Sequence, residues 1–263
     1  PTMFDRDIYF NFLKTSRLGK ELVTLDIVDS TNAWVAERLD EQRLHFAVVV
    51  AENQTEGRGR LGRNWLSPPL VNLAFSLAWG TNIDIKNLNT VTLAAGIALC
   101  CACQEVAKLT PELKYPNDLV FNGKKLGGIL AELRQQGDQN IVVLGIGVNV
   151  NTQNNQFPEE LQRTSTSLFQ LTGMSLSREK LLASMINHLE LWLDFLSENG
   201  SKLVIEEYRK YCSTFIQREV EVISGSRIIV GVAIGIDDNG GLLVEVSPGV
   251  VETVYSGETR FFD

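Results

Sequence analysis

The sequence has no excess of positive charge and no internal repeat. Its 263 residues include 24 Lys and Arg against 32 Asp and Glu, which gives a formal net charge of −8. A protein that follows a nucleic-acid backbone needs a basic face, so this balance disfavours a nucleic-acid partner. The missing repeats and low-complexity tracts disfavour solenoid architectures. The composition, with 44% hydrophobic and 21% charged residues, is that of an ordinary globular protein.

Long apolar runs and a leader pattern are also missing. No apolar segment reaches the roughly 18 residues that a membrane span needs. The longest candidate, residues 91–107, is interrupted by Thr92, Gln104 and Glu105. Residues 1–7 lack the charged-then-apolar pattern of a signal peptide, although a targeting segment removed earlier stays open. We therefore expect a cytoplasmic protein with no membrane partner.

Cysteine and histidine are scarce, with four and two residues respectively. Cys100, Cys101 and Cys103 crowd into one apolar segment, which is typical of small buried side chains rather than of a disulfide framework. His45 and His188 both lie far from them along the chain. A zinc site is therefore not expected, and the chain fits a reducing compartment.

The order of the expected elements predicts two domains, residues 1–213 and 214–263. In the first, we expect helices over residues 7–20, 33–38, 89–109, 177–196 and 201–211 and strands over 21–28, 46–51, 72–79, 113–121, 125–133 and 139–150. In the second, short β-rich runs alternate with Gly, Asn and Asp turns, over residues 220–223, 226–237, 241–246 and 250–255. This texture indicates a small all-β module such as a barrel.

The most informative segment is residues 57–65, which contains three arginines and three glycines. Glycine lets a backbone approach a ligand closely, and arginine offers planar donors that suit phosphate and carboxylate. Trp65 ends the segment with a flat surface on which a base can stack. A loop that folds over an anionic nucleotide is therefore predicted. A solvated basic hairpin tip is the alternative.

Four further segments carry polar groups in patterns that suit a ligand. They are residues 29–32 (Asp-Ser-Thr-Asn), 114–118 (Lys-Tyr-Pro-Asn-Asp), 123–130 (Gly-Lys-Lys-Leu-Gly-Gly-Ile-Leu) and 145–151 (Gly-Ile-Gly-Val-Asn-Val-Asn). Taken singly, the first is also a helix N-cap, the second a surface turn and the third an exposed strand lysine. Asn149, in the last, needs a hydrogen-bond partner if it is buried.

These segments, in this order, resemble the biotin protein ligases, also called holocarboxylase synthetases. The family's Gly-Arg-Gly-Arg-x-Gly-Arg loop matches residues 57–63, and its Lys-Trp-Pro-Asn-Asp motif matches residues 114–118 with Tyr115 in the Trp position. Its Lys-Leu-x-Gly-Ile-Leu, Gly-x-Gly-x-Asn and Ser-Thr-Asn segments match residues 125–130, 145–149 and 30–32. The resemblance runs from about residue 22 to the end of the chain.

The resemblance implies an α+β fold. It implies a mixed, mainly antiparallel sheet backed by helices, as in the catalytic domains of class II synthetases and lipoate ligases, and a small C-terminal SH3-like β-barrel. Bifunctional members carry an N-terminal helix-turn-helix domain, and about 20 residues before Glu21 are too few for it. A monofunctional ligase that does not bind operator DNA is therefore expected.

The resemblance also implies the reaction and its participants. Biotin would be activated with ATP and Mg²⁺ as biotinoyl-5′-AMP and then transferred to a lysine of an apo biotin carboxyl carrier domain of a carboxylase. A monomer and a homodimer are both compatible with the sequence. Two alternatives remain: a lipoate or octanoyl ligase of the same fold, and a non-catalytic biotin sensor.

The motif matches assign candidate site residues. The biotin-binding set is Ser30, Thr31, Asn32, Gln54, Gly57, Arg58, Gly59, Arg60, Lys125, Gly128 and Gly145. The ATP-binding and adenylate-binding set is Arg60, Arg63, Trp65, Asn117, Asp118, Lys125 and Asn149. The expected catalytic residues are Arg58, Arg60, Lys125 and Asp118.

The expected roles follow from charge and shape. Arg58, Arg60 and Lys125 would neutralise the carboxylate and the α-phosphate, which otherwise repel each other. Trp65 would stack on adenine, whereas Asn117 and Asp118 would contact the adenylate or its magnesium, or orient the incoming lysine. No protein metal site is expected, because ATP would carry the Mg²⁺.

Overall fold

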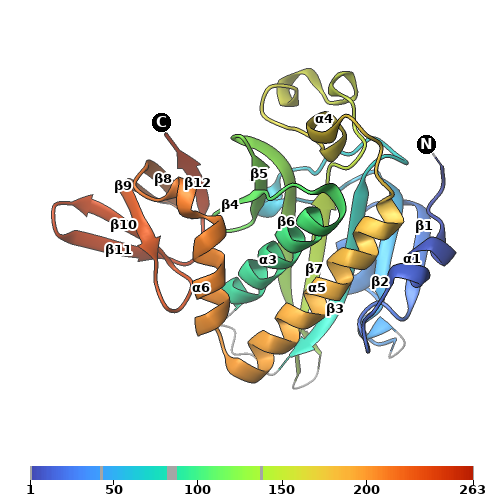
Figure 1. The fold of residues 1–263 in the computed structure, drawn as a ribbon. Helices are drawn as coiled ribbons and strands as arrows, with labels where there is room; N and C mark the ends of the chain where they lie inside the picture. The colour runs from blue at the N-terminus through green and yellow to red at the C-terminus, as the bar shows by residue number, and fades with distance from the viewer. Residues whose placement is uncertain (1, 42–43, 82–87, 137–138, 263) are drawn as a thin grey trace.

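A computed structural model describes residues 2–41, 44–81, 88–136 and 139–262 of the chain. The larger part is a seven-stranded sheet with helices on both faces, and a second, five-stranded sheet lies beside it at the C-terminal end (Figure 1). The predicted fold class, a mainly antiparallel sheet with helices plus a small β module, is confirmed. The exact domain boundary after residue 213 stays a prediction.

The large sheet has the strand order β1-β2-β3-β7-β6-β5-β4. Its strands are β1 (Leu22–Val28), β2 (Val48–Gln54), β3 (Leu73–Thr81), β4 (Glu112–Lys114), β5 (Asp118–Phe121), β6 (Lys124–Gln136) and β7 (Gln139–Val148). Only the β1–β2 pair is parallel, and the other neighbours are antiparallel.

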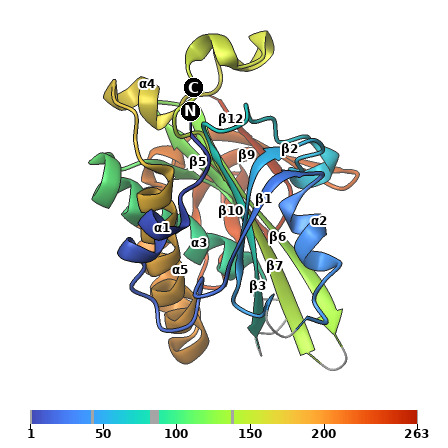
Figure 2. The same ribbon diagram turned by 90° about the vertical axis from the view of Figure 1, so that its right-hand side faces the viewer.

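Helices cover the two faces of this sheet unequally. They are α1 (Arg6–Phe12), α2 (Thr31–Ala36), α3 (Leu88–Ala107), α4 (Leu168–Thr172), α5 (Arg178–Asn199) and α6 (Lys202–Tyr211). The long helices α3 and α5 lie against one face, with α1 packed on α5, whereas the short α2 lies on the other (Figure 2).

The side chains of the central strands explain this layering. In β7, Val142 and Leu144 belong to the main core under α3 and α5, whereas Ile141 and Val143 belong to a second apolar cluster with Val35 of α2. Successive side chains of a strand point to opposite faces, so a continuous apolar run predicts a strand covered on both sides.

The second sheet has the order β11-β10-β9-β8-β12. Its strands are β8 (Glu219–Ser224), β9 (Arg227–Ile236), β10 (Leu242–Ser247), β11 (Val250–Val254) and β12 (Glu258–Phe261). Four of them match predicted β runs, and β12 was missed because its four residues, Glu-Thr-Arg-Phe, show no apolar alternation. β12 pairs with β8, the first strand of the module. The hydroxyl of Thr259 on β12 donates to the carbonyl of Tyr115, which follows β4, so β12 lies beside the large sheet.

The predicted helix over residues 7–20 is shorter than expected. It ends at Phe12, and the following backbone is held by α5 instead of continuing as a helix. The Asn187 amide oxygen accepts the Lys14 N–H at 2.7 Å, and the Glu190 carboxylate accepts the Ser16, Arg17 and Leu18 N–H groups at 2.6–2.8 Å. These long-range acceptors replace the helical hydrogen bonds, which a local pattern cannot predict.

The apolar helix α3 is a core helix by its burial. Within the described part of the chain it is the one helix long and apolar enough to cross a membrane, but 78% of its apolar 18-residue stretch is buried in the molecule. Its cysteines Cys100, Cys101 and Cys103, together with Cys212, are free thiols. Burial raises the pKa of Cys103 to about 12, which keeps this thiol protonated and unreactive.

Candidate active site

Three cavities meet near the ends of β2, β5 and β6. A narrow one of about 60 Å³ lies over β6 and β7, and a large one of about 870 Å³ lies between α3, β6 and the C-terminal module. A third, of about 160 Å³, lies between the loop over residues 59–65 and β12. Arg60 and Asn117 line all three cavities. Any two ligands held in neighbouring cavities would therefore meet at this pair.

The floor of the narrow cavity is a polar network at the start of α2. Gln54, at the end of β2, accepts hydrogen bonds from the Thr31 N–H at 2.8 Å and the Thr31 hydroxyl at 3.0 Å. Ser30 occupies the N-cap position but makes no side-chain cap hydrogen bond. The helix start is thus satisfied by Gln54, and the Ser30 hydroxyl lines the cavity without its usual capping partner.

Asn32 forms the back of the narrow cavity and is held by several strands. Its Oδ1 lies 2.6 Å from the Ser76 hydroxyl, and its Nδ2 donates to the Glu132 carboxylate at 2.9 Å. The side chain fits because Gly145 faces it: a Cβ there would lie 2.1 Å from Asn32 Oδ1. Gly145 is therefore required by close approach of a side chain rather than by backbone conformation.

Trp65 lies inside the narrow cavity, against Gly147 of β7. A Cβ at Gly147 would come within 2.4 Å of the indole ring. The indole Nε1 is buried and has no hydrogen-bond partner among the described residues. Trp65 lines the narrow and the third cavity but not the large one, and its predicted contact with adenine stays a prediction. The two glycines of β7, Gly145 and Gly147, leave room for the side chains of Asn32 and Trp65.

The loop over residues 57–65 folds back on itself as a short hairpin. The Trp65 N–H donates to the Gly57 carbonyl at 2.8 Å, and the Gly59 N–H donates to the Arg63 carbonyl at 2.7 Å. Gly62 has a φ of 74°, the left-handed conformation that glycine favours. This hairpin places Arg58 and Arg60 at the narrow cavity and carries Arg63 toward β12.

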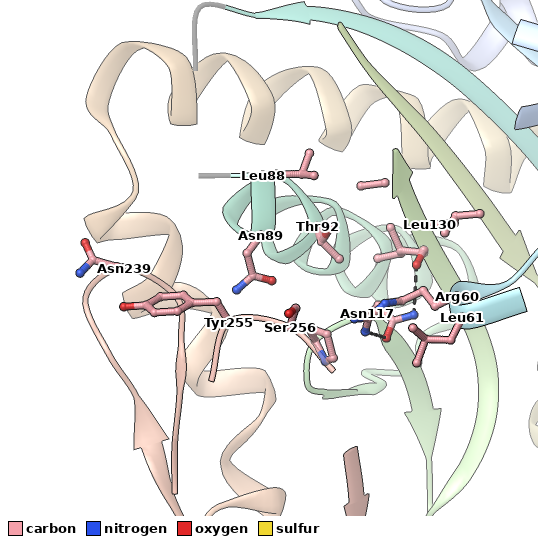
Figure 3. Close-up of a pocket in the computed structure, with 13 residues that line it drawn as sticks. Arg60, Leu61, Leu88, Asn89, Thr92, Asn117, Leu130, Asn239, Tyr255 and Ser256 are labelled. Carbon is pink, nitrogen blue, oxygen red and sulfur yellow. Dashed lines mark hydrogen bonds between the residues drawn. The ribbon is translucent and has the colours of Figure 1, made fainter. Parts of the chain in front are cut away.

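Arg60 is the half-buried cation at the junction. Its Nη1 donates to Asn117 Oδ1 at 2.9 Å, and Asn117 Nδ2 donates to the Ile129 carbonyl at 3.1 Å (Figure 3). Burial lowers the pKa of Arg60, while the nearby Asp118, Tyr115 and Glu258 act in the opposite direction. An arginine stays protonated in proteins, so the junction holds a partly desolvated positive charge.

A second cation stands beside it on β6. Lys125 Nζ lies 2.7 Å from Asp118 Oδ1 and 6.0 Å from the centroid of the Trp65 ring. Gly128 lies next to this side chain, and a Cβ there would be in ordinary van der Waals contact with Lys125 Cε at 3.4 Å. The predicted catalytic residues Lys125 and Asp118 are therefore brought together as an ion pair at the cavity wall.

The third cavity is the most strongly charged part of the site. Arg63 is ion-paired with Glu258 of β12, and Arg260 Nε lies 3.5 Å from the same carboxylate. Burial, with Lys125 and Arg63 adding to it, lowers the pKa of Lys114, which lines the same wall. Sequence reasoning missed Glu258 and Arg260 as site residues, because they come from a different sheet.

The large cavity brings together the two sheets. Asn239, Tyr255 and Ser256 of the C-terminal module line one side, and Arg60, Leu61 and Asn117 lie across from them (Figure 3). The remaining lining residues are Leu88, Asn89 and Thr92 of α3, Pro116, and Ile129, Leu130 and Ala131 of β6. Of these residues, only Arg60 and Asn117 were named as candidate site residues from the sequence. Pro116, Ile129 and Leu130 lie in the motif segments, whereas the residues of α3 and of the C-terminal module belong to none.

The predicted residues distribute unevenly over the cavities. All of the expected biotin-binding residues except Gly57 line the narrow cavity. Gly57 lies beneath it, where a Cβ would meet the Trp65 carbonyl oxygen at 2.4 Å. Asn149 lines none of the three cavities. Its Nδ2 donates to the Thr166 carbonyl at 3.1 Å and its Oδ1 accepts from Asn72 at 3.4 Å, so this buried amide has protein partners. Its predicted contact with the adenylate stays a prediction.

The fold and these cavities define a protein that holds two small ligands side by side. The narrow cavity has uncharged hydrogen-bonding groups at its base, and the large one is mainly apolar. Positive charge is concentrated where they meet, which suits a reaction between two anionic groups. This is the arrangement of a ligase that activates a carboxylic acid with a nucleotide.

Comparison with known proteins identifies the family. Residues 25–149 match the biotin/lipoate A/B protein ligase family, and residues 215–259 match the biotin protein ligase C-terminal domain. The chain is 34% identical over 254 residues to the bifunctional ligase/repressor BirA of Bacillus subtilis, covering 94% of this chain and 75% of that protein. It is 31% identical over 251 residues to the biotin–[acetyl-CoA-carboxylase] ligase of Mycobacterium tuberculosis, covering 94% of this chain and 91% of that protein.

Solved structures agree with this assignment. The biotin protein ligase from Aquifex aeolicus in complex with biotin and ATP superimposes with a TM-score of 0.77 at 32% identity, covering 92% of this chain and 99% of that chain. The chain belongs to the biotin protein ligase family.

Proposed function

We propose that the protein is an ATP-dependent biotin protein ligase. It activates biotin as biotinoyl-5′-AMP and transfers the biotinoyl group to a lysine of a biotin carboxyl carrier domain. The observation that carries this proposal is the position of Arg60 and Asn117, which line the narrow, the large and the third cavity at once. A carboxylate and a phosphate held in adjacent cavities would meet at this pair.

Biotin is assigned to the narrow cavity. Its ureido ring needs both donors and acceptors, which Ser30, Thr31 and Gln54 supply at the base. The orphaned Trp65 N–H offers one more buried donor. A volume of about 60 Å³ is too small for the fused bicycle, so we propose that Trp65 and the loop over residues 57–65 move outward to admit the ligand and then close over it.

The nucleotide is assigned to the large cavity and its phosphates to the third. The apolar walls formed by Leu88, Ile129 and Ala131 suit a base, and Arg60 leads from there toward the cationic wall. The described residues include no group of three or more His, Cys, Asp or Glu that could hold a metal ion. We propose that Mg²⁺ arrives on ATP and neutralises phosphate charge.

The first step joins the two ligands. A carboxylate oxygen of biotin attacks the α-phosphorus, the bond to the β-phosphate breaks, and pyrophosphate leaves with the electron pair. Arg60, with Arg58 and Lys125 beside it, neutralises the carboxylate and the charge that develops on the α-phosphate. The closed loop keeps water from the anhydride until the acceptor arrives.

In the second step the acceptor lysine attacks the carbonyl carbon of the adenylate, and AMP leaves. We assign Asn117 to the adenylate, because it lines the large cavity, and Asp118 to the phosphate side, because it lines only the third. From there Asp118 is placed to orient the Mg²⁺-bound phosphates or the incoming amine.

The partners follow from this activity. We propose an apo carrier domain of a carboxylase as the macromolecular substrate, action in the cytoplasm, and no nucleic-acid partner for a chain of net charge −8.

Transfer to the carrier tests the proposal directly. The protein, biotin and Mg·ATP are incubated with an apo carrier domain, and intact-protein mass spectrometry follows the carrier. We expect one biotinoyl adduct that needs ATP and the acceptor lysine. An adduct formed with lipoate or octanoate but not with biotin would favour the lipoate-ligase alternative, and biotin binding without any adduct would favour a sensor.

A further inference from the structure

Tyr115 connects the site to the C-terminal module. It is the residue of the 114–118 motif that departs from the family pattern, and it is fully buried beside β4 and β5. Its hydroxyl lies 3.1 Å from the Gly240 carbonyl and 3.0 Å from the Val254 carbonyl, so its single proton is shared between two loops of the module. Asn89 of α3 donates to the same hydroxyl at 3.0 Å.

A second connection holds the backbone of the same residue. The Thr259 hydroxyl, on β12, donates to the Tyr115 carbonyl at 2.5 Å. Asn89 also donates to the Gly240 carbonyl at 2.5 Å, which closes a small network between α3, Tyr115 and the module. Tyr115 is therefore fixed to the second sheet through both its side chain and its main chain.

The two carbonyls that Tyr115 holds are significant because of their neighbours. Gly240 directly follows Asn239, and Val254 directly precedes Tyr255. Asn239 and Tyr255 form the module's side of the large cavity (Figure 3). One hydroxyl group thus holds both loops that close this cavity, and two residues further along the chain Asn117 faces the junction.

We infer that Tyr115 is a positioning residue for the nucleotide: through Gly240, Val254 and Thr259 it sets the distance between the module's wall of the large cavity and the Asn117–Asp118 strand. This inference rests on the proposed function, in which the large cavity receives the nucleotide. The module then takes part in nucleotide binding through its placement, although the 114–118 motif lies on the other sheet.

The inference separates the two substrates. Ser30 and Thr31 lie at the start of α2 and Gln54 at the end of β2, and among the described residues none of the hydrogen bonds of Tyr115 reaches them. Loosening the contact between Tyr115 and the module should therefore weaken ATP binding and leave biotin binding unchanged. If the Tyr115 hydroxyl were purely structural, its removal would lower the stability of the protein and leave the affinities for ATP and biotin unchanged.

The experiment compares Tyr115→Phe with a matched control, Tyr9→Phe. Tyr9 is also a buried tyrosine whose hydroxyl donates to a backbone carbonyl, that of Gly19 at 3.1 Å, and it lies far from the site on α1. Each variant is assayed for biotin-dependent exchange of labelled pyrophosphate into ATP, for biotin affinity by calorimetry, and for Tm. Amide hydrogen exchange of residues 237–241 and 253–259 reports on the module loops independently of activity.

We expect Tyr115→Phe to raise KM for ATP about five- to tenfold, as loss of one buried hydrogen bond predicts, with biotin Kd unchanged. Faster amide exchange in the two module loops should accompany it. Tyr9→Phe should lower Tm by about as much as Tyr115→Phe does, because each variant loses a buried tyrosine hydroxyl. It should leave KM for ATP unchanged. Thr259→Val, which removes the second connection from the module's side, should raise KM for ATP in the same direction.

Three results would overturn the inference. They are an unchanged KM for ATP in Tyr115→Phe, an equal loss of affinity for biotin and ATP in this variant, or amide exchange in both module loops that is as slow as in the parent. If Tyr115→Phe does not fold, an unchanged KM in Thr259→Val decides against it. Absence of biotin-dependent pyrophosphate exchange in the parent protein would instead contradict the proposed function. The failure of the inference and the failure of the proposed function are therefore distinguishable.

Discussion

Asn117 accepts a hydrogen bond from the Arg60 guanidinium at 2.9 Å, and this pair stands where three cavities join. The arginine comes from a loop after β2 and the asparagine from the turn before β5, more than 50 residues apart in the chain. The amide fixes the direction of the guanidinium without neutralising it. The positive charge therefore stays available to a carboxylate and a phosphate.

Replacing Arg60 tests this charge. Arg60→Gln keeps hydrogen-bonding capacity toward Asn117 but removes the cation, so we expect kcat/KM for adenylation to fall about 100- to 1000-fold. The measurement is biotin-dependent pyrophosphate exchange. Arg227→Gln, a similarly neutralised arginine that is ion-paired with Glu252 on the module surface, should stay within about twofold of the parent. Equal activity in both variants would contradict the role of Arg60.

Adding one methyl group tests the assignment of Trp65. Gly147→Ala places a Cβ within 2.4 Å of the indole and should displace the ring. Because overpacking of this kind costs about 1–3 kcal/mol, we expect biotin affinity to fall about tenfold or more. Gly80→Ala, in the adjacent strand β3, meets nothing within 4 Å and is the control. Calorimetric titration with biotin distinguishes them; unchanged affinity in Gly147→Ala would place biotin elsewhere.

Arg58 tests whether the loop retains the intermediate. Its side chain is exposed at the rim of the narrow cavity, on the hairpin that would close over the adenylate. We expect Arg58→Ala to release biotinoyl-AMP faster than the parent, because the closed loop would lose one charged contact with the adenylate. Dissociation of preformed labelled adenylate, chased with unlabelled biotin and ATP, measures this. Equal dissociation rates would show that the loop does not act as a latch.

Glu190 gives a prediction on stability and pH. Burial acts to raise the pKa of Glu190, but hydrogen bonds from the Leu18, Ser16 and Arg17 N–H groups outweigh it and lower the pKa below its ordinary 4.5. A lowered folded-state pKa contributes stability above pH 4.5, and this contribution is lost as the pH falls through the folded value.

We therefore expect Glu190→Gln to lose about 1–2 kcal/mol of unfolding free energy at pH 7 and progressively less below pH 4.5. Urea unfolding at several pH values measures the difference. Glu198→Gln, an exposed position on the same helix, is the control. A difference that persists unchanged to low pH would contradict the proposed hydrogen bonds to the carboxylate.

Much of the fold could be predicted from local patterns. Continuous apolar runs gave β2 and β7, and the Ala-rich, Leu-rich and Cys-rich segment gave α3, because strands buried on both faces and core helices leave a clear periodicity or length. α1 was predicted too long and β12 was missed. Their limits depend on Glu190 and on pairing with β8, which are long-range partners that a local pattern does not contain.

The residues of the candidate site also differ in how far a local pattern predicts them. The residues predicted for biotin lie in ordered motifs, and the structure brings nearly all of them to one cavity. The large cavity was not predicted beyond Arg60 and Asn117, because residues such as Asn89 and Tyr255 contribute shape from separate elements rather than from a motif. Asn149 is the one member of the predicted adenylate-binding set that lines none of the three cavities, and its amide donates to the Thr166 carbonyl.

The most direct test of the central claim is exchange of labelled pyrophosphate into ATP by the purified protein, with biotin and lipoate as parallel substrates. The account predicts exchange that requires biotin, is not supported by lipoate, and is lost in Arg60→Gln. Exchange with lipoate alone, or no exchange despite measurable biotin binding, would contradict the claim that this junction activates biotin.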